Sequence, residues 1–481
     1  MKAHPRARRL YAVMTGLALA ATVAMVSVTQ ASGPATATIT VSGAPEGQSE
    51  CHIGANEGDQ YFNINDLTDL GINTYRMYGG MSRWEWQDDS STFGSPTIAQ
   101  IEANPDVINW PWWDAAMNAT APTQNGSDYW WTGDSNVWKG SAATIFGTLQ
   151  AHNIRPVVVL RNVDNNDNPS WAYTQLDPPN TTAGQNEWWE HVFATVYWLN
   201  VRNNYNVNDW EVHNKPNNDG QGWEGTEADY FNFVQLTKSA IDYVYQTYLP
   251  GRTYHVYAPV TTGGSSWPND ALLQVGSYFD SMDVHNYSGN IDGCDETVHG
   301  YMNADGYPND PLWLAEWSTY RGQYTSVSFD VSNVIGNLMN GSAPGDNYVY
   351  GSEIFSLYDC GTYTSGLIGP GDVPRAGYYA FRLAIRALQG CRPTYLSASN
   401  NSNIQALTTK DSSGHVYVLM INTGHTAITT TINLSSLLSS GAGTMWVFDS
   451  SHNDVVVGSP VLSGGSVTVS LGPVSGDLIE F

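Results

Sequence analysis

Along residues 51–358, short apolar segments alternate with longer segments in which apolar residues recur every three or four positions. Segments of the first kind are typical of buried β-strands, and those of the second kind of amphipathic helices. The predicted strands are, in chain order, residues 51–55, 73–78, 155–160, 210–213, 254–258, 282–285, 312–316 and 348–356. The predicted helices are residues 63–70, 142–152, 187–202, 227–248, 331–339 and 376–388. Eight strands, each followed by a connection that returns to the next, predict an α/β fold of the (β/α)8 TIM barrel type.

A second pattern begins near residue 391, where Ser, Thr, Gly and Asn become more frequent and apolar and polar residues alternate. The alternating segments, separated by turn residues, are 404–408, 415–421, 428–434, 444–448, 466–471 and 478–481. Such short strands predict a small all-β sandwich domain. We therefore expect a barrel over residues 32–390 and a sandwich over 391–481, packed together because no linker separates them. The alternating segment TATITV, residues 36–41, either precedes the barrel or joins the sandwich.

The first 31 residues have the order of charged and apolar residues that is typical of a secretory signal peptide. Four basic residues are followed by an apolar run from Leu10 to Val28 and then by Thr29-Gln30-Ala31. An uncleaved membrane anchor is the alternative, because the apolar run is close to the length of a membrane span. We expect cleavage after Ala31 and a secreted, extracellular protein whose mature form has no membrane segment.

Acidic residues dominate the charge of the chain, since 45 Asp and Glu against 19 Lys and Arg give a formal net charge of −26. Such a surface repels nucleic acid and anionic membranes and suits a neutral partner, so we expect an oligo- or polysaccharide. The 18 Trp residues include groups in polar stretches, where flat rings can stack on the C–H faces of sugars. The groups expected to form a sugar-binding surface are Trp84 with Trp86, Trp110 with Trp112 and Trp113, and Trp130 with Trp131.

The four cysteines, Cys51, Cys294, Cys360 and Cys391, are widely spaced and form no Cys-x-x-Cys pair. This spacing argues against a zinc site, and in an exported protein it indicates one or two disulfides. Three pairings are possible if all four cysteines are bridged, and the sequence does not choose among them. The chain also lacks a His-Glu-x-x-His motif, a phosphate-binding P-loop and a Gly-x-Gly-x-x-Gly segment after a strand. We therefore expect no metal and no cofactor.

Polar side chains gather where three of the predicted barrel strands end. Residues 210–217 read WEVHNKPN, residues 283–287 read DVHNY, and residues 314–317 read LAEW. The carboxyl ends of barrel strands form the mouth at which TIM-barrel enzymes carry out their chemistry. These three segments are therefore the candidate active site.

The WEVHNKPN segment resembles the W-E-x-x-N-E-P-N signature of the clan A glycoside hydrolases, which include the family 39 β-xylosidases. In that clan the Glu after Asn is the general acid/base, and a Glu that ends strand seven is the nucleophile. The resemblance extends over nearly all of the chain after the leader. It implies a retaining O-glycoside hydrolase that acts on β-linked or arabinose-containing glycans, with Glu316 as the nucleophile and Lys215 at the acid/base position.

The same resemblance implies roles for the residues around these two positions. Arg76 is expected to keep Glu316 ionised through its charge and through bidentate hydrogen bonds. Asn214 would donate a hydrogen bond to the sugar 2-hydroxyl, and Tyr287 would donate one to Glu316. Glu211, inside strand four, is expected to form a structural pair rather than to act in catalysis. The implied substrate-binding residues are Arg76, Asn214, His285, Tyr287 and Trp317.

Two positions depart from the clan pattern. The Trp that ends strand eight is absent, and Phe355 and Tyr358 are the nearest aromatic residues. Lys215 replaces the acid/base Glu, although an ammonium group cannot accept a proton and is a poor acid at neutral pH. General acid/base catalysis contributes roughly 10²–10⁴-fold to the rate, so that much is missing unless another group supplies it.

Three interpretations of Lys215 are open. A substitute acid could come from Asp219, Glu224 or Glu227 in the segment that follows. The protein could instead be a weak enzyme restricted to substrates with good leaving groups. Alternatively, it is a pseudoenzyme that binds carbohydrate without cutting it. A second carboxyl group about 5–6 Å from Glu316 would favour the first interpretation, because retaining glycosidases need that separation.

Overall fold

The structure is a computed structural model of the 481-residue chain. It describes residues 35–57, 62–85, 88–119, 141–161, 178–218, 223–263, 265–289, 291–318, 324–342, 349–359 and 364–481. The predicted signal peptide, residues 1–31, lies outside the described residues. None of the described helices is long and apolar enough to cross a membrane.

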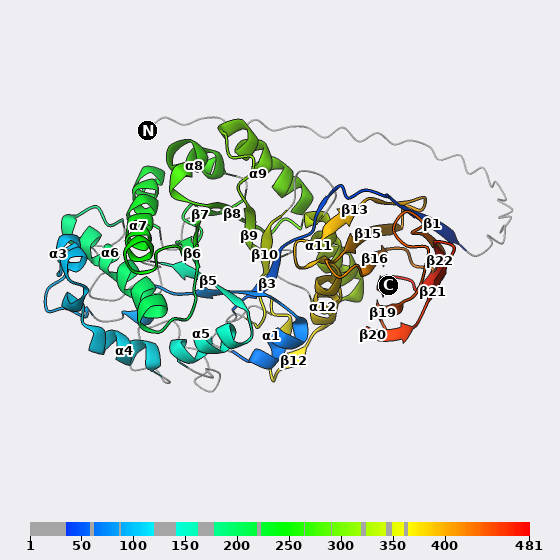
Figure 1. Ribbon diagram of the computed structural model, residues 1–481, viewed down its shortest axis with the longest axis horizontal. Coiled ribbons are helices and arrows are strands. Elements are labelled where there is room, and N and C mark those ends of the chain that lie inside the picture. Colours follow the sequence, from blue (N-terminus) through cyan, green and yellow to red (C-terminus); the bar gives the residue numbers. More distant parts are fainter. Residues whose placement is uncertain are drawn as a thin grey trace, which may run out of the picture. The chain divides into compact units, whose positions relative to one another are not determined.

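In the described part of the chain, eight parallel strands close a barrel in the order β10-β3-β4-β5-β6-β7-β8-β9 (Figure 1). Their bounds are β3 His52–Asn56, β4 Thr74–Tyr78, β5 Arg155–Leu160, β6 Asp209–Val212, β7 His255–Thr262, β8 Ser281–Asn286, β9 Leu312–Trp317 and β10 Gly351–Ile354. These are the eight predicted strands, and β7 runs four residues beyond its predicted end. The predicted TIM barrel is therefore confirmed.

Helices lie around the barrel strands (Figure 1). Their bounds are α1 Ile64–Leu70, α2 Met81–Trp84, α3 Ile98–Ala103, α4 Trp110–Asn118, α5 Ala142–Ala151, α6 Thr182–Tyr197, α7 Glu227–Tyr248, α8 Trp267–Val275, α9 Ile291–Asp305, α10 Val327–Asp330, α11 Gly336–Gly341 and α12 Ala376–Leu388. Shorter 3-10 or π turns are η1 Pro105–Val107, η3 Trp198–Arg202, η4 Gly276–Tyr278 and η5 Val331–Ile335. Helix α7 begins where predicted because Thr226 and Asp229 form a reciprocal capping box at its first turn.

The C-terminal strands form two antiparallel-rich sheets, as the alternating pattern predicts. The first has the order β14-β1-β17-β22-β21-β18, and the second the order β2-β13-β15-β16-β23-β19-β20. The bounds are β1 Thr36–Val41, β2 Gly47–Gln48, β13 Pro393–Tyr395, β14 Ser397–Ser399, β15 Ile404–Lys410, β16 Val416–Asn422, β17 Ile428–Asn433, β18 Ser440–Ala442, β19 Thr444–Phe448, β20 Asn453–Gly458, β21 Val461–Ser463, β22 Ser466–Leu471 and β23 Ser475–Glu480. A further small ribbon pairs β11 Ile368–Gly369 with β12 Val373–Pro374. The TATITV segment is β1, so it belongs to the sandwich and lies between β14 and β17.

Sandwich and barrel share one hydrophobic core. Leu407, Leu419 and Phe448 of the sandwich are fully or nearly fully buried in the same apolar cluster as the barrel helices. Arg382 of α12 also donates to the buried Asp454 of β20, with Nε and Oδ2 2.6 Å apart. The expected packing of the two parts is therefore present. Because residues 35–481 form one compact unit, the division of the chain at residue 391 stays a prediction.

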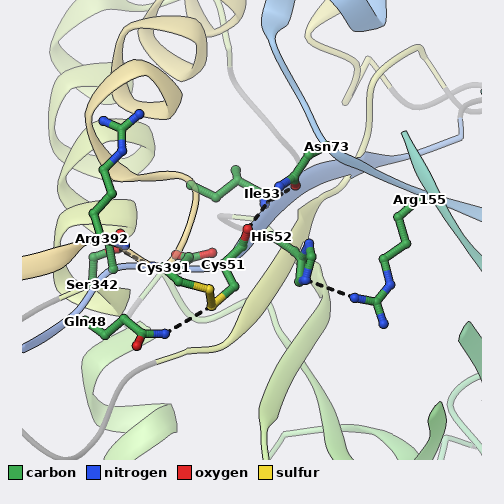
Figure 2. The surroundings of a disulfide bond; sticks show 11 residues. Gln48, Cys51, His52, Ile53, Asn73, Arg155, Ser342, Cys391 and Arg392 are labelled. Atoms are coloured by element: carbon green, nitrogen blue, oxygen red, sulfur yellow. Dashed lines mark hydrogen bonds between the residues drawn. A yellow bond between two sulfur atoms is a disulfide. The ribbon is translucent and has the colours of Figure 1, made fainter. Parts of the chain in front are cut away.

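One disulfide joins Cys51, just before β3, to Cys391, just after α12 (Figure 2). Gln48 donates from Nε2 to Sγ of Cys51 at 3.1 Å. Cys294 on α9 is a free thiol, and Cys360 lies outside the described residues. Of the pairings that the sequence leaves open, the structure therefore forms one that fastens the start of the barrel to the start of the sandwich.

The expected sugar-binding surface of Trp residues is not found where the structure describes them. Trp84, Trp110 and Trp113 are at most 7% exposed and lie in the hydrophobic core, and Trp112 is half-buried. Trp110 stacks on Tyr197 of α6, with ring centroids 5.1 Å apart. These rings are buried because α2 and α4 pack against the helix layer of the barrel rather than extending into solvent. Trp86, Trp130 and Trp131 lie outside the described residues.

Candidate active site

Parallel pairing of the barrel strands brings the polar strand ends together. In the β3–β4 pair Asn56 lies opposite Arg76, and in the β8–β9 pair His285 lies opposite Glu316. The side chains of Arg76, His285 and Glu316 are buried. A group of ionisable residues is thus held inside the mouth of the barrel, away from bulk water.

Glu316 accepts hydrogen bonds on both carboxylate oxygens. Oε1 accepts from Nη1 of Arg76 at 2.7 Å and from the hydroxyl of Tyr78 at 2.9 Å. Oε2 accepts from the hydroxyl of Tyr287 and lies 2.5 Å from Nζ of Lys215. A carboxylate offers about four acceptor sites, so these four donors occupy all of them.

These contacts keep Glu316 ionised. Burial alone would raise the pKa of its carboxyl, but the interaction with Lys215, followed by those with His285 and Arg76, lowers the pKa and outweighs burial. The pKa of Glu316 therefore lies well below its usual value of 4.5. An ionised carboxylate at the end of a barrel strand is the form that a nucleophile requires.

Arg76 makes its bidentate hydrogen bonds to Glu211, not to Glu316. Its Nε donates to Oε2 of Glu211 at 2.6 Å, and its Nη2 donates to Oε1 of the same carboxylate. Nη1 donates to Oδ1 of Asn56 at 2.7 Å as well as to Glu316. The prediction of a bidentate Arg76–Glu316 pair is therefore wrong, because Glu211 on β6 accepts the two hydrogen bonds from Nε and Nη2 of the guanidinium group. Glu211 forms the structural pair that the sequence predicts for it.

Lys215 is held in place by its backbone. Its N–H donates to the carbonyl of Val260 at 2.9 Å, and its φ of 51° lies in the left-handed region, which non-glycine residues rarely adopt. Its side chain is 13% exposed, and Nζ lies 5.3 Å from the ring centre of Tyr287 and 5.8 Å from that of Phe355. The ammonium group is thus enclosed by the carboxylate of Glu316 and two aromatic rings.

Burial shifts the pKa values of three further groups around these charges towards their neutral forms. Burial lowers the pKa of His285 to about 4, so its imidazole carries no charge. Burial also raises the pKa of Glu353 to about 8 and that of Asp283 well above its usual value. Burial also raises the pKa of Glu211, whereas the neighbouring Arg76 favours its ionised form. Lys215 lies against the other carboxylate, that of Glu316.

Glu211, Asp283 and His285 are the described residues that could together hold a cation. One ligand atom of each lies within 4.8 Å of the others, and all three side chains are buried. The carboxylate of Glu211 is already engaged by the guanidinium of Arg76. A cation here would lie next to that positive charge, so the residues fit a network of neutral and paired groups better than a metal ion.

Comparison of the sequence finds no match to any protein-family model and no match to any curated protein. Solved structures do match. A glucosidase from Croceicoccus marinus aligns over 92% of this chain and 98% of its own, with a TM-score of 0.65 and 14% identity. An arabinofuranosidase of glycoside hydrolase family 51 from Xanthomonas axonopodis pv. citri aligns over 93% and 99%, with a TM-score of 0.64 and 11% identity. A family 39 enzyme from the same organism aligns over 94% and 99%, with a TM-score of 0.61 and 14% identity.

The chain has the fold of the clan A glycoside hydrolases. The resemblance seen in the WEVHNKPN segment is thereby confirmed for the fold. The alignments span the barrel and the sandwich together, so the combination of the two parts is shared as well.

The structure brings most of the predicted site residues together. Around Glu316 it places Arg76, Lys215, His285 and Tyr287. Nδ1 of His285 lies 3.4 Å from Oε2 of Glu316, but neither ring nitrogen makes a hydrogen bond to a described residue. Asn214 also belongs to the group. Its Oδ1 accepts from Nη2 of Arg76 at 3.1 Å, which leaves its amide nitrogen able to donate to a ligand.

Trp317 does not lie at the site. It is 1% exposed and belongs to the hydrophobic core, where its ring lies 6.4 Å from that of Phe381 on α12. Successive residues of a strand point to opposite faces, so Trp317 points out of the barrel when Glu316 points in. The expectation that Trp317 binds substrate is therefore wrong. Of the two aromatic residues near the end of β10, Phe355 lies close to Tyr287, whereas Tyr358 is buried and donates to Asp66.

Of the three suggested substitute acids, the two that the structure describes do not lie beside Glu316. Asp219 lies outside the described residues. Glu224 is exposed, and Glu227 is the first residue of α7, where burial and the nearby Asp270 raise its pKa. Neither Glu224 nor Glu227 is among the described side chains that contact Glu316.

The sequence interpretation missed two members of the site, Tyr78 and Asn56. Tyr78 donates to Glu316, and Asn56 accepts from Arg76 while its Nδ2 donates to the carbonyl of Ala315 at 2.8 Å. A signal for Tyr78 was present, because residues two apart on a strand share a face and Tyr78 follows Arg76 by two. Asn56 ends β3 as the other site residues end their strands.

Proposed function

We propose that this protein is a secreted retaining O-glycoside hydrolase of neutral, β-linked or arabinose-containing glycans, with Glu316 as its nucleophile. The observation that carries the proposal is the ionised carboxylate of Glu316 at the end of β9, oriented by Arg76, Tyr78 and Tyr287. Asn214 is placed to donate to a sugar hydroxyl. The shared fold supports the same class of reaction.

Lys215 limits which substrates can react. In the first step Glu316 would form a bond to the anomeric carbon while the bond from that carbon to the leaving oxygen breaks. Lys215, at the position of the acid, is a poor proton donor, so the leaving group must depart as an anion. Water would then attack the anomeric carbon, release Glu316 and lose its proton to solvent. Activity is therefore expected for leaving groups that are stable as anions and is expected to be very low for alkyl glycosides.

Aryl glycosides of different acidity test the proposal. The 2,4-dinitrophenyl and methyl glycosides of β-xylose, β-glucose, β-galactose and α-L-arabinofuranose would be compared. We expect turnover of at least one dinitrophenyl glycoside. The methyl glycoside of the same sugar should react more slowly, and the ratio of the two rates should exceed the roughly 10²–10⁴-fold that acid/base catalysis contributes. Glu316→Gln should abolish the turnover. Unchanged turnover in Glu316→Gln would exclude Glu316 as the nucleophile.

A second candidate function is carbohydrate binding without cleavage. The observation that favours it is the 2.5 Å contact between Nζ of Lys215 and Oε2 of Glu316, because the ammonium group occupies an oxygen that would attack the sugar. Binding of sugars by the wild type, without release of dinitrophenolate from any of the four glycosides, would select this function.

Secretion is the remaining part of the proposal. The leader of residues 1–31 and the Cys51–Cys391 disulfide support it, because disulfides persist in oxidising compartments. When the full chain is expressed in a secreting bacterial host, the protein in the medium should begin at Ser32. An intact N-terminus on protein retained in the membrane fraction would contradict cleavage and favour an anchor.

A further inference from the structure

A cavity of about 770 Å³ adjoins the candidate active site. It lies between the ends of β7 and β8 and the helix α9, and His285 and Tyr287 line it. The same two residues contact Glu316. Sites for small molecules have volumes of roughly 300–1,000 Å³, so this cavity has room for a ligand beyond the sugar that would contact the nucleophile.

One wall of the cavity is a face of α9. Cys294, Thr297, Val298 and Tyr301 line it, and their spacing of three, four and seven residues places them on one side of the helix. Thr297 is exposed, and its hydroxyl donates to the carbonyl of Gly293 at 2.8 Å. This wall is therefore a regular element rather than a chance gap between loops.

The opposite wall is fastened to the segment that carries Lys215. Nδ2 of Asn217, two residues after Lys215, donates to the carbonyl of Thr262 at 2.9 Å and to the hydroxyl of Ser265 at 3.0 Å. Thr262 and Ser265 both line the cavity. The wall is thus preformed, and it is coupled in position to the acid/base side of the active site.

The lining has the chemistry of a site for a neutral sugar. Hydroxyl groups come from Ser265, Ser266, Thr297 and Tyr301, and apolar surface comes from Pro268 and Val298. No Asp, Glu, Lys or Arg is among the described residues that line it. Hydroxyls can donate and accept, as sugar hydroxyls do, and the apolar patches suit the C–H faces of the rings.

We propose that this cavity binds further sugar units of the same glycan, so that the protein recognises a neutral oligosaccharide rather than a single terminal sugar. The inference rests on the proposed function, because it assumes that one sugar of the chain lies at Glu316. The glycan would pass Tyr287 and continue between α9 on one side and Thr262 and Ser265 on the other.

Titration calorimetry on the mature protein tests this inference. The dissociation constants of xylohexaose, cellohexaose and laminarihexaose would be compared with those of methyl β-xyloside and methyl β-glucoside. The wild type should bind at least one hexaose about 10-fold or more tightly than the matching methyl glycoside. Thr297→Trp, which fills the cavity from an exposed position, should remove that preference, whereas Thr297→Ser keeps the hydroxyl and should retain it. Tyr301→Phe is a second variant that keeps the ring. It should weaken hexaose binding about fivefold through loss of one hydrogen bond.

Two results would overturn the inference: no hexaose binds more tightly than its methyl glycoside, or Thr297→Trp and Tyr301→Phe both bind the hexaose as the wild type does. Turnover of the dinitrophenyl monoglycosides separates this failure from failure of the proposed function, because these probes need only the site at Glu316. The wild type should turn these probes over whether or not it binds a hexaose more tightly than the methyl glycoside.

Discussion

Lys215 acts on Glu316 in two opposite ways. Its ammonium charge is the largest of the favourable contributions that hold the pKa of Glu316 below its usual value, which keeps the carboxylate ready to react. If Glu316 is the nucleophile as proposed, the ammonium group that contacts Oε2 must move away before that oxygen can reach a sugar. Lys215 then both favours the ionised form of Glu316 and restricts access to it.

The pH profile of dinitrophenyl glycoside turnover should show this charge effect. A carboxyl whose pKa is lowered stays ionised until the pH falls through that low value, so the wild-type kcat/KM should not decline between pH 7 and about pH 5. Lys215→Met removes the favourable charge, raises the pKa of Glu316 and should move the acid limb of the profile to higher pH.

Lys238→Met is the matched control, because Lys238 pairs with Asp242 within α7 and not with the site. Its profile should match that of the wild type. If kcat/KM falls at the same acidic pH in Lys215→Met and in the wild type, Lys215 does not set the pKa of Glu316.

Individual site residues could be predicted from the strand-end motifs, but their hydrogen-bond partners could not. Arg76 and Glu316 were expected to meet, and they do. The bidentate hydrogen bonds of the Arg76 guanidinium go to Glu211 instead. Which carboxylate accepts them depends on the register of the neighbouring strands, which the sequence does not show. Trp317 was assigned to the site by its place in the chain, although strand alternation turns it outward.

At the scale of elements, α6 carries a buried acidic group that the proposed mechanism does not use. Glu187 and Glu190 of α6 lie with Glu85 and Asp89 of the segment after β4, and His191 contacts Glu85 at 2.7 Å. Burial raises the pKa of Glu187 to about 8, that of Asp89 to about 6 and that of Glu190 well above its usual value. Neither carboxylate oxygen of Glu190 has a hydrogen-bond partner among the described residues.

This group should make the protein less stable as the pH rises. A carboxyl with a raised pKa keeps its proton in the folded state after the unfolded chain, with a usual value of 4.5, has lost it. Each such group then lowers the free energy of unfolding by about 1.4 kcal/mol per pH unit until the folded pKa is reached. Glu190→Gln removes this contribution, and we expect it to stabilise the protein more at pH 8 than at pH 5, by more than the roughly 1.4 kcal/mol that one pH unit contributes.

Urea unfolding of wild type and Glu190→Gln at the two pH values measures the difference. Glu102→Gln serves as control, because Glu102 is an exposed residue of α3. An equal effect of Glu190→Gln at pH 5 and pH 8 would mean that Glu190 does not hold a proton in the folded state.

The elements that the sequence predicts well are those whose apolar period is strong. The helices at 227–248 and 376–388 have the expected bounds. Helix α9 was missed, because Gly293, Gly300 and several acidic residues dilute an apolar period that consists of little more than Ile291, Val298 and Met302. Its stability comes from packing on the barrel, which a local pattern does not reveal.

At the scale of the whole molecule, the N-terminal segment joins both sheets of the sandwich before the barrel begins. Strand β1 and strand β2 each join a sheet of the sandwich, and the disulfide follows at once. The barrel and the sandwich could each be predicted from their patterns of alternation. The pairing of β1 between β14 and β17 could not, because it joins segments that are more than 350 residues apart.

The disulfide should contribute strongly to the stability of this arrangement. It links residues 340 positions apart, so it restricts the unfolded chain over most of its length. Replacing both Cys51 and Cys391 by Ala should lower the free energy of unfolding by about 2–4 kcal/mol. Urea unfolding measures the loss, and Cys294→Ser, at the free thiol, is the matched control. A double variant with the unfolding midpoint of the wild type would show that the fold does not depend on this link.

We propose that this chain is a glycosidase with Glu316 as its nucleophile and Lys215 in place of the acid. A comparison of wild type and Lys215→Glu on glycosides of one sugar, with leaving groups from dinitrophenol to methanol, tests this proposal. A Glu at this position would lie near the ionised Glu316, which raises its pKa and lets it donate a proton.

We predict that Lys215→Glu is faster than the wild type by roughly 10²-fold or more on the poorest leaving groups, with a much smaller difference on dinitrophenyl glycosides. If the wild type already cleaves methyl glycosides rapidly and Lys215→Glu slows this cleavage, Lys215 takes part in a different mechanism and the proposed role is wrong.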